Sequence, residues 1–114
     1  MSTVSIHPYF KAKEGKLNDL KALCPGLVEL VAKESKCKYF GFTFDGDTMF
    51  AREAYEGAAG VLEHLENAGE AIGAVFEVAD LVTIEVHGSA EDLEQLKEPL
   101  TDLNPTYFTL EFGA

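Results

Sequence analysis

The sequence predicts an α+β fold with one antiparallel sheet, and three features of the chain lead to this prediction. Five segments alternate apolar and polar residues with the two-residue period of strands: 3–10, 37–44, 48–55, 81–87 and 107–112. Helix-patterned sequence separates the first two of these segments and also the third from the fourth. Asp45-Gly46 joins the second to the third, and Asp-Gly is a strong hairpin signal because both central turn residues need positive φ. The order β-α-β-β-α-β is that of ferredoxin-like folds.

The first strand places Val4, Ile6, Pro8 and Phe10 on one face. Pro8 cannot donate a hydrogen bond to a neighbouring strand, so we expect a sheet edge or a bulge there. The helical pattern of residues 14–35 is interrupted by Cys24-Pro25-Gly26, where proline predicts a kink or a break.

The hairpin strands carry the aromatic residues of the predicted core. The second strand sends Phe40, Phe42 and Phe44 to one face. The third strand separates two sets, which are Met49, Ala51, Glu53 and Tyr55 on one face and Phe50, Arg52 and Ala54 on the other. For Arg52 we favour an ion pair with a carboxylate at the sheet edge over anion binding.

The second half of the chain continues the pattern. A helix is predicted from about residue 56 to 76, with Gly69 and Gly73 weakening its second half. The fourth strand places Val82, Ile84 and Val86 on the apolar face. Ser89 and Asp92 fit a capping box that starts an extra short helix. The last strand is expected to turn a third set towards the core, namely Phe108, Leu110 and Phe112.

Length and composition indicate a single domain spanning 1–114. The formal net charge of −11 disfavours nucleic-acid binding and attachment to anionic lipid. No apolar run is long enough to span a bilayer and no secretory signal is present, so we predict a cytoplasmic protein without membrane contact. Cys24 and Cys37 match no metal or redox motif and are expected to be buried thiols.

The face of the sheet opposite the helices is predicted to be amphipathic and rich in tyrosine. It comprises Ser5, His7, Tyr9, Tyr39, Thr43, Thr83, Glu85, Tyr107 and Glu111. Tyrosine is large and apolar with a polar tip, which suits an interface. We therefore expect a homodimer that pairs these faces.

Several of these residues also resemble a known family. The hairpin leading into Glu53-Ala54-Tyr55, the helix with Glu63-His64-Leu65, and Cys37 with Tyr39 resemble the antibiotic biosynthesis monooxygenase (ABM) family. The resemblance implies ferredoxin-like subunits paired into a dimeric α+β barrel. It also implies oxidation of polycyclic phenols or quinols by molecular oxygen without a cofactor, or, in a related branch, haem degradation between the second helix and the sheet. The chain departs from both branches in having no tryptophan, which their best-described enzymes place in the pocket.

His64 is the main candidate for a catalytic residue. It falls about 90° from the centre of the apolar stripe of its helix, so it can turn towards a pocket or towards water. It can act as a general base, hydrogen-bond a phenolic substrate or bind a metal; the alternative is a boundary histidine with no chemistry.

The pocket is predicted between the second helix and the apolar sheet face, with a volume of a few hundred Å³. Tyr55 is a candidate binder of a ligand hydroxyl, although packing in the core is favoured for it. Phe40 and Phe42 are predicted substrate-binding walls, and the other expected walls are Phe44, Phe108 and Phe112. Room above the sheet would come from the small residues Ala58, Ala68, Gly69 and Gly73. The competing prediction is a solid core filled by these aromatics.

His7 and His87 share the amphipathic face with Glu85 and Glu111, where a polar interface network is favoured over a metal site. We predict no bound metal, and the sequence leaves the roles of His7, His87 and Arg52 open.

These observations predict a cofactor-independent monooxygenase that acts on a quinol or phenolic small molecule. The alternatives are a non-catalytic dimeric module for small-molecule binding or stress, and a haem-degrading relative. The predicted partners are a second copy of the chain and a small aromatic substrate.

Overall fold

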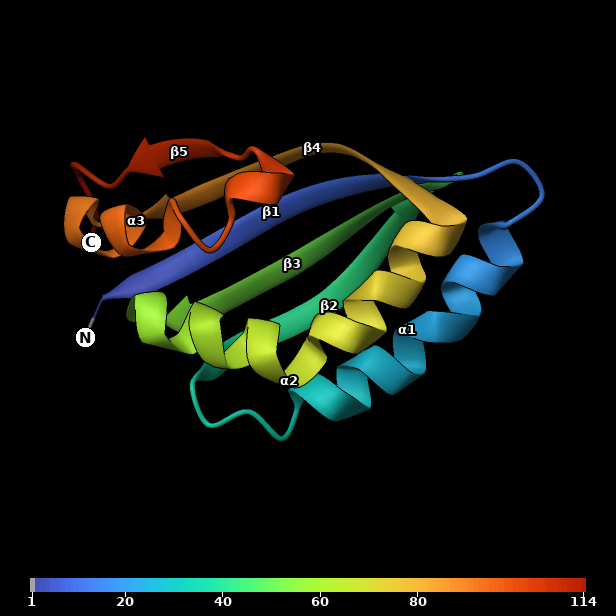
Figure 1. Ribbon diagram of the computed structural model, residues 1–114, viewed down its shortest axis with the longest axis horizontal. Helices are drawn as coiled ribbons and strands as arrows, with labels where there is room; N and C mark the ends of the chain where they lie inside the picture. The colour runs from blue at the N-terminus through green and yellow to red at the C-terminus, as the bar shows by residue number, and fades with distance from the viewer. Residues whose placement is uncertain (1) are drawn as a thin grey trace.

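The computed structural model describes residues 2–114 as one sheet with helices on a single side (Figure 1). Its elements in chain order are β1 (Thr3–Ala12), α1 (Leu17–Val31), β2 (Cys37–Asp45), β3 (Thr48–Glu56), α2 (Gly57–Val78), β4 (Ala79–Gly88), α3 (Ala90–Leu96), the 3₁₀ helix η1 (Thr101–Leu103) and β5 (Thr106–Thr109).

The strands lie in the order β2-β3-β1-β4-β5. The first four form the antiparallel sheet of a ferredoxin-like fold, which confirms the predicted fold class. β5 extends this sheet by pairing with β4 in parallel. Helices α1 and α2 lie side by side over one face, and α3 and η1 cover the same face over β1 and β4 (Figure 1).

The hairpin between β2 and β3 turns one residue later than predicted. Asp45 pairs with Thr48, so the two loop residues are Gly46 and Asp47. Gly46 alone of the two has positive φ, 61°, a conformation that glycine adopts without steric cost.

Pro8 lies in a central strand, so the edge prediction is wrong and the bulge prediction is confirmed. The register between β1 and β4 shifts just after Pro8, since Tyr9 pairs with Thr83 and Phe10 with Leu81. Val82 is the extra residue of this bulge and is 64% exposed. The prediction that Val82 faces the core is therefore wrong, because the bulge turns Leu81 inwards instead.

The last strand, β5, turns towards the helices the face opposite to the one that the sequence predicted. Tyr107 pairs with the buried Val86, and Phe108 pairs with His87 of the open face. Paired residues of neighbouring strands share a face, so Tyr107 points towards α3 and its hydroxyl donates to the Leu96 carbonyl (3.4 Å). Phe108, Leu110 and Phe112 are exposed, which corrects their predicted core positions.

Helix α1 continues through Pro25, so the predicted break is absent. Leu20 on one side of the proline, and Leu27 and Val31 on the other, are buried in one hydrophobic cluster. This packing holds both halves of the helix against the sheet.

The predicted capping box at the start of α3 is confirmed. The Asp92 backbone N–H donates to the Ser89 hydroxyl (3.1 Å). The Asp92 carboxylate also accepts from the Ala58 N–H (3.0 Å) and the Ser2 hydroxyl (2.5 Å). One acidic residue thereby ties α3, the N-terminus of α2 and the start of β1 together.

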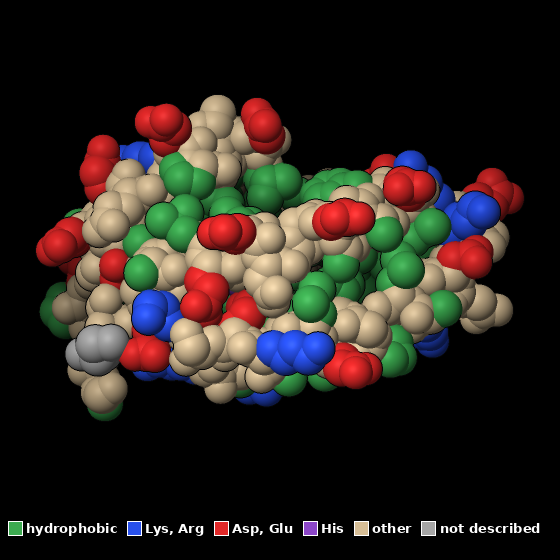
Figure 2. Space-filling model, turned by 60° about the horizontal axis from the view of Figure 1, so that its bottom comes forward, with side chains coloured by type: hydrophobic (Ala, Val, Ile, Leu, Met, Phe, Trp, Pro, Cys, Tyr) green, Lys and Arg blue, Asp and Glu red, His purple; other side chains and the backbone are tan. Residues whose placement is uncertain are grey.

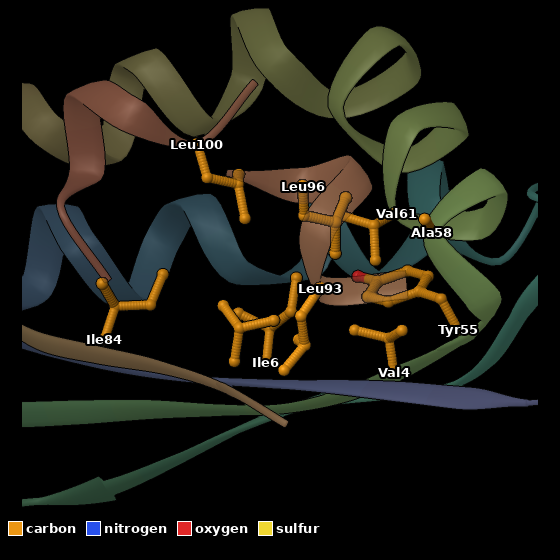
Figure 3. Close-up of a cluster of buried hydrophobic side chains, with 10 residues drawn as sticks. Val4, Ile6, Tyr55, Ala58, Val61, Ile84, Leu93, Leu96 and Leu100 are labelled. Atoms are coloured by element: carbon orange, nitrogen blue, oxygen red, sulfur yellow. The ribbon is translucent and has the colours of Figure 1, made fainter. Parts of the chain in front are cut away.

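The core consists of two clusters under the helices. One gathers around Val4, Ile6, Tyr55, Val61 and Leu96 beneath α2 and α3 (Figure 3). The other gathers around Phe10, Leu20, Met49 and Val75 beneath α1 and the second half of α2. Cys24 and Cys37 are free thiols that are half-buried rather than buried, and burial raises the pKa of Cys37 to about 11.

Acidic side chains are dispersed on the face of the molecule that Figure 2 shows, and hydrophobic side chains are visible among them. None of the helices in residues 2–114 is long and apolar enough to cross a membrane.

Candidate active site

His64 lies in α2 and points inwards, with 3% of its surface exposed. Its helix approaches β3 closely because Gly60 carries no side chain. A Cβ at Gly60 would lie 2.8 Å from the Tyr55 Cβ and 3.1 Å from the Lys36 carbonyl oxygen. The glycine thus lets the first turns of α2 settle on the sheet, and His64 follows one turn later above Glu53.

Glu34 approaches His64 from the loop between α1 and β2. Its carboxylate accepts from the Nδ1 side of the His64 ring at 3.0 Å and from the Asn67 amide at 2.9 Å. The Glu34 side chain is 1% exposed. A buried carboxylate at Nδ1 fixes the imidazole tautomer that carries its proton on Nδ1, so Nε2 has a free lone pair.

The loop that carries Glu34 is fastened to α2 by neighbours of His64. Glu63 accepts from the Ser35 hydroxyl (3.0 Å) and from the Lys36 N–H (3.1 Å), and Asn67 donates to the Leu30 carbonyl (3.2 Å). This anchoring holds the Glu34 carboxylate against the ring, as a catalytic histidine requires of its orienting partner.

Glu53 faces the other ring nitrogen of His64. Its Oε1 lies 3.6 Å from Nε2, too far for a direct hydrogen bond, and accepts from the Tyr55 hydroxyl at 2.6 Å. Glu53 is buried on the core face of β3. The four side chains Glu34, His64, Glu53 and Tyr55 therefore form a continuous buried polar row.

Burial sets the protonation of this row. Desolvation raises the pKa of Glu53 to about 8, with the Glu34 charge adding to the shift and the Tyr55 hydrogen bond opposing it. Desolvation lowers the pKa of His64, partly opposed by the hydrogen bond and charge of Glu34. Near neutral pH the site therefore holds a neutral imidazole beside a protonated carboxylic acid, which is a base next to an acid.

A cavity of about 90 Å³ lies between α2 and the sheet, where the sequence predicted a pocket, and His64 lies on its wall. The volume falls short of the predicted few hundred Å³, because apolar side chains of α2, β1 and η1 fill most of the space. The volume is also smaller than the roughly 300 Å³ or more of pockets that hold drug-sized ligands, and a haem is larger than most such ligands.

The predicted wall residues divide into two groups. Phe40 and Phe42 line the cavity, whereas Phe44 lies outside the lining beneath the Lys21 ammonium (5.1 Å from the ring centroid). Phe108 and Phe112 are exposed elsewhere. The small residues Ala58, Ala68, Gly69 and Gly73 are also absent from the lining, so they do not create this space.

Tyr55 is fully buried and does not line the cavity. Its hydroxyl is engaged by Glu53, so its place in the structure is behind the acid rather than against a ligand. The predicted roles of His64, Tyr55, Phe40 and Phe42 stay predictions.

The sequence indicated one of the two glutamates of the site, Glu53, and gave no sign of the other, Glu34. Glu53 alternates with Met49, Ala51 and Tyr55 on the core face of its strand, and a carboxylate at such a position is a visible signal of a functional site. Glu34 lies in a loop among other charged residues, and nothing in the sequence distinguishes it from them.

The open face of the sheet holds a second group of histidines. The His7 and His87 rings lie 4.5 Å apart, with Phe108 stacked on His87 at 4.7 Å. His7 contacts the Ser5 hydroxyl and His87 contacts Glu85. In residues 2–114 no three His, Cys, Asp or Glu side chains are placed to hold a metal ion together.

Arg52 stacks on a ring instead of pairing with a carboxylate. Its guanidinium lies 4.5 Å from the Tyr39 ring centroid. No ion pair of Arg52 is found within the part of the chain that the structure describes, so the predicted ion pair is wrong. The cation–π contact takes its place because both side chains lie on the open face of the hairpin.

No protein-family model and no curated protein sequence matches the chain. Several solved structures do match it. MupZ from Pseudomonas fluorescens is 39% identical, with a TM-score of 0.93 over 98% of this chain and 88% of that protein. Candidate antibiotic biosynthesis monooxygenases share the fold at lower identity. One from Chloroflexus aurantiacus is 17% identical (TM-score 0.62, 74% of this chain and 89% of that one), and one from Caulobacter crescentus is 16% identical (TM-score 0.65, 75% and 87%). The fold is that of the ABM proteins, as the resemblance predicted.

Proposed function

The chain belongs to the same family as MupZ, and from this premise we propose that it is an acid–base enzyme that takes a proton from a small, largely apolar molecule, as a cofactor-independent monooxygenase of a phenol or quinol does. The observation that carries the proposal is the buried His64, held by Glu34 at Nδ1 and lining an apolar cavity through its other side.

The chemistry assigned to His64 follows from its environment. The neutral Nε2 accepts the hydroxyl proton of the substrate, and the Glu34 carboxylate stabilises the imidazolium that forms. The apolar walls exclude water and leave an electron-rich anion beside the ring. In a monooxygenase this anion reduces dioxygen, one atom of which stays in the product while the other leaves as water.

Oxygen consumption with a panel of hydroquinones and single-ring phenols tests the oxidative form of the proposal. Wild type should consume oxygen in proportion to product, and His64→Gln should be at least a hundredfold slower. His87→Gln, a histidine beside a glutamate on the open face, is the matched control. Absence of uptake by the wild type across the panel would remove these substrates, and equal rates for both variants would clear His64 of its role.

A second candidate is a proton-transfer reaction that uses no oxygen, and the protonated Glu53 favours it. Oxidation of a phenolate needs a base alone, whereas an isomerisation or a ring closure needs a base at one atom and an acid at another. His64 and Glu53 face the same cavity and supply both.

Solvent deuterium separates the two candidates. Under nitrogen in D₂O, the oxygen-independent proton-transfer reaction incorporates deuterium at a carbon atom of a hydroxylated or carbonyl substrate, which proton NMR detects as a lost C–H signal. The monooxygenase alternative predicts conversion that stops when oxygen is removed. Loss of exchange in Glu53→Gln with exchange retained in Glu85→Gln would support the acid role.

We also propose that two copies pair through the open sheet face. His7, Tyr9, Phe50, His87 and Phe108 form a row of rings there, with neighbouring centroids 4.5–6.1 Å apart. Light scattering should give twice the monomer mass, and Phe108→Asp should reduce it to the monomer. A clean monomer of the wild type at micromolar concentration would contradict the pairing.

A further inference from the structure

The cavity beneath α2 is long as well as small. Its lining on the helix extends from His64 to Phe76, twelve residues further along, which corresponds to about 18 Å of helix. On the sheet below, the lining extends from Glu53 to Met49 along β3 and from Ile6 to Phe10 along β1. The space is therefore a slot that follows the direction of the strands.

All polar side chains of the slot lie at one end. Ile6 and Phe40 pair with Glu53 across the sheet, which places all three at the His64 end. Phe10 pairs with both Met49 and Leu81 at the other end, and Phe76 packs on Phe10 with ring centroids 5.5 Å apart. Of the lining residues within 2–114, Glu53 and His64 alone carry polar side chains.

The volume limits the shape of a ligand. The slot measures about 90 Å³, whereas an engineered apolar cavity that accepts benzene in another protein measures about 150 Å³. A small volume spread along a long slot means a narrow cross-section. Such a space suits an unbranched chain better than a fused ring system.

We propose that the substrate is an amphiphile, with one hydroxyl-bearing head between His64 and Glu53 and an unbranched apolar tail lying along α2 towards Phe76. This assignment rests on the proposed function for the head group and goes beyond it for the tail. The far end of the slot offers no partner to a second polar group, because its side chains are aromatic and aliphatic. A molecule with a polar group at each end would leave one of them buried without a hydrogen bond.

Calorimetric titration with two matched ligand series tests the proposal. The first series is unbranched 1-alkanols from butanol to octanol, and the second carries an additional hydroxyl at the far end of chains of the same length. In the first, affinity should rise about threefold to fourfold per methylene until the slot is filled. In the second, each ligand should bind at least tenfold more weakly than its partner in the first series. A flat dependence on tail length, or equal binding of the two series, would overturn the proposal.

Ala51 provides a second measurement because it lines the middle of the slot, between Glu53 and Met49. Ala51→Leu should place a branched side chain across the space, so that the gain in affinity stops at a shorter tail. Ala51→Gly is the control, in which the gain should continue as in the wild type. Thermal unfolding shows whether both variants fold. If either variant does not fold, the two ligand series on the wild type still test the proposed ligand class.

Binding tests the proposed ligand class and turnover tests the proposed function, so the two proposals can fail independently. Titrations under nitrogen measure the tail without any reaction. Affinity that rises with tail length in a protein without turnover would overturn the proposed function and keep the ligand class. Turnover of tailless phenols with no effect of tail length would do the reverse.

Discussion

A histidine lies 3.0 Å from a glutamate on each side of the sheet, and the two pairs differ in their surroundings. His64 points inwards from α2 and Glu34 approaches it from the α1–β2 loop, with side chains 4% and 1% exposed. His87 and Glu85 lie on the open face with side chains 40% and 38% exposed. The same residue types at the same distance therefore provide a direct test of what burial adds.

Burial changes both the energy and the function of such a pair. Water screens the exposed pair, so its contribution to stability is small. The buried pair has lost its hydration, and each group must be satisfied by a neighbour: Asn67 donates to Glu34, and Glu53 lies beyond the ring. A third partner and a cavity make the buried pair a candidate for catalysis, whereas the exposed pair has stacked rings as neighbours.

The largest effect is expected from removing the buried ring. His64→Ala should lower the rate of the reaction by about 10²–10⁴, the usual contribution of a general base. His87→Ala should change it less than twofold. Steady-state kinetics on any substrate that the wild type converts compares the two variants directly.

Similar losses in both variants would contradict the contrast between the faces. A loss in His64→Ala that an added imidazole reverses would strengthen it, because the small base would occupy the space that the ring has left.

The next effect concerns the carboxylate behind the ring. Glu34→Gln keeps an acceptor for Nδ1 but removes the charge that raises the pKa of His64, so that this pKa should fall further below 6.5. The acid limb of the rate profile should move to lower pH, with the plateau rate about tenfold lower. Glu66→Gln, which changes an exposed glutamate of the same helix, is the control and should leave the profile in place.

The sequence predicted the architecture more completely than the site, and particular residues show why. Strand alternation and the hairpin signal fix the faces of β1, β2 and β3, because each depends only on neighbouring residues. Pro8 indicated a bulge in β1, but the exposed position of Val82 opposite it and the reversed faces of β5 depend on pairing between distant strands. No local pattern distinguishes Tyr107 from Phe108 as the residue that faces the helices.

The site shows the same division. His64 was identifiable from its place beside an apolar stripe, and Glu53 from its position on a core face. Glu34 reaches the ring only because the α1–β2 loop is tied to Glu63 and Asn67. Its partner is 30 residues away in the chain, so spacing carries no information about the contact.

A smaller effect is expected on the free energy of unfolding. The folded protein holds the Glu53 proton up to a pKa of about 8, whereas the unfolded chain releases it near the ordinary value of 4.5. Between these values the folded state binds more protons, so its stability falls as pH rises, by up to about 1.4 kcal/mol per pH unit. His64 and His7, whose pKa values are lowered by burial, give the opposite slope only below their ordinary value of 6.5.

The window from pH 6.5 to 8 therefore isolates Glu53. Urea unfolding of the wild type should show stability declining across it, and Glu53→Gln should remove the decline while keeping an acceptor for Tyr55. Glu85→Gln should retain the wild-type slope. An identical decline in Glu53→Gln would show that another group titrates there.

The smallest effect is expected on the open face, because the exposed His87–Glu85 pair should contribute much less to stability than the buried His64–Glu34 pair. Glu85→Gln removes the charge 3.0 Å from His87 at a site where both side chains are more than a third exposed. Because solvent already screens this pair, the free energy of unfolding should change by less than about 0.5 kcal/mol, and less still in 1 M salt. Urea unfolding at low concentration of the chain measures this without a contribution from pairing of the faces. A loss above 2 kcal/mol would mean that something shields the pair from water, and repeating the measurement over a range of chain concentrations would show whether that is a second copy.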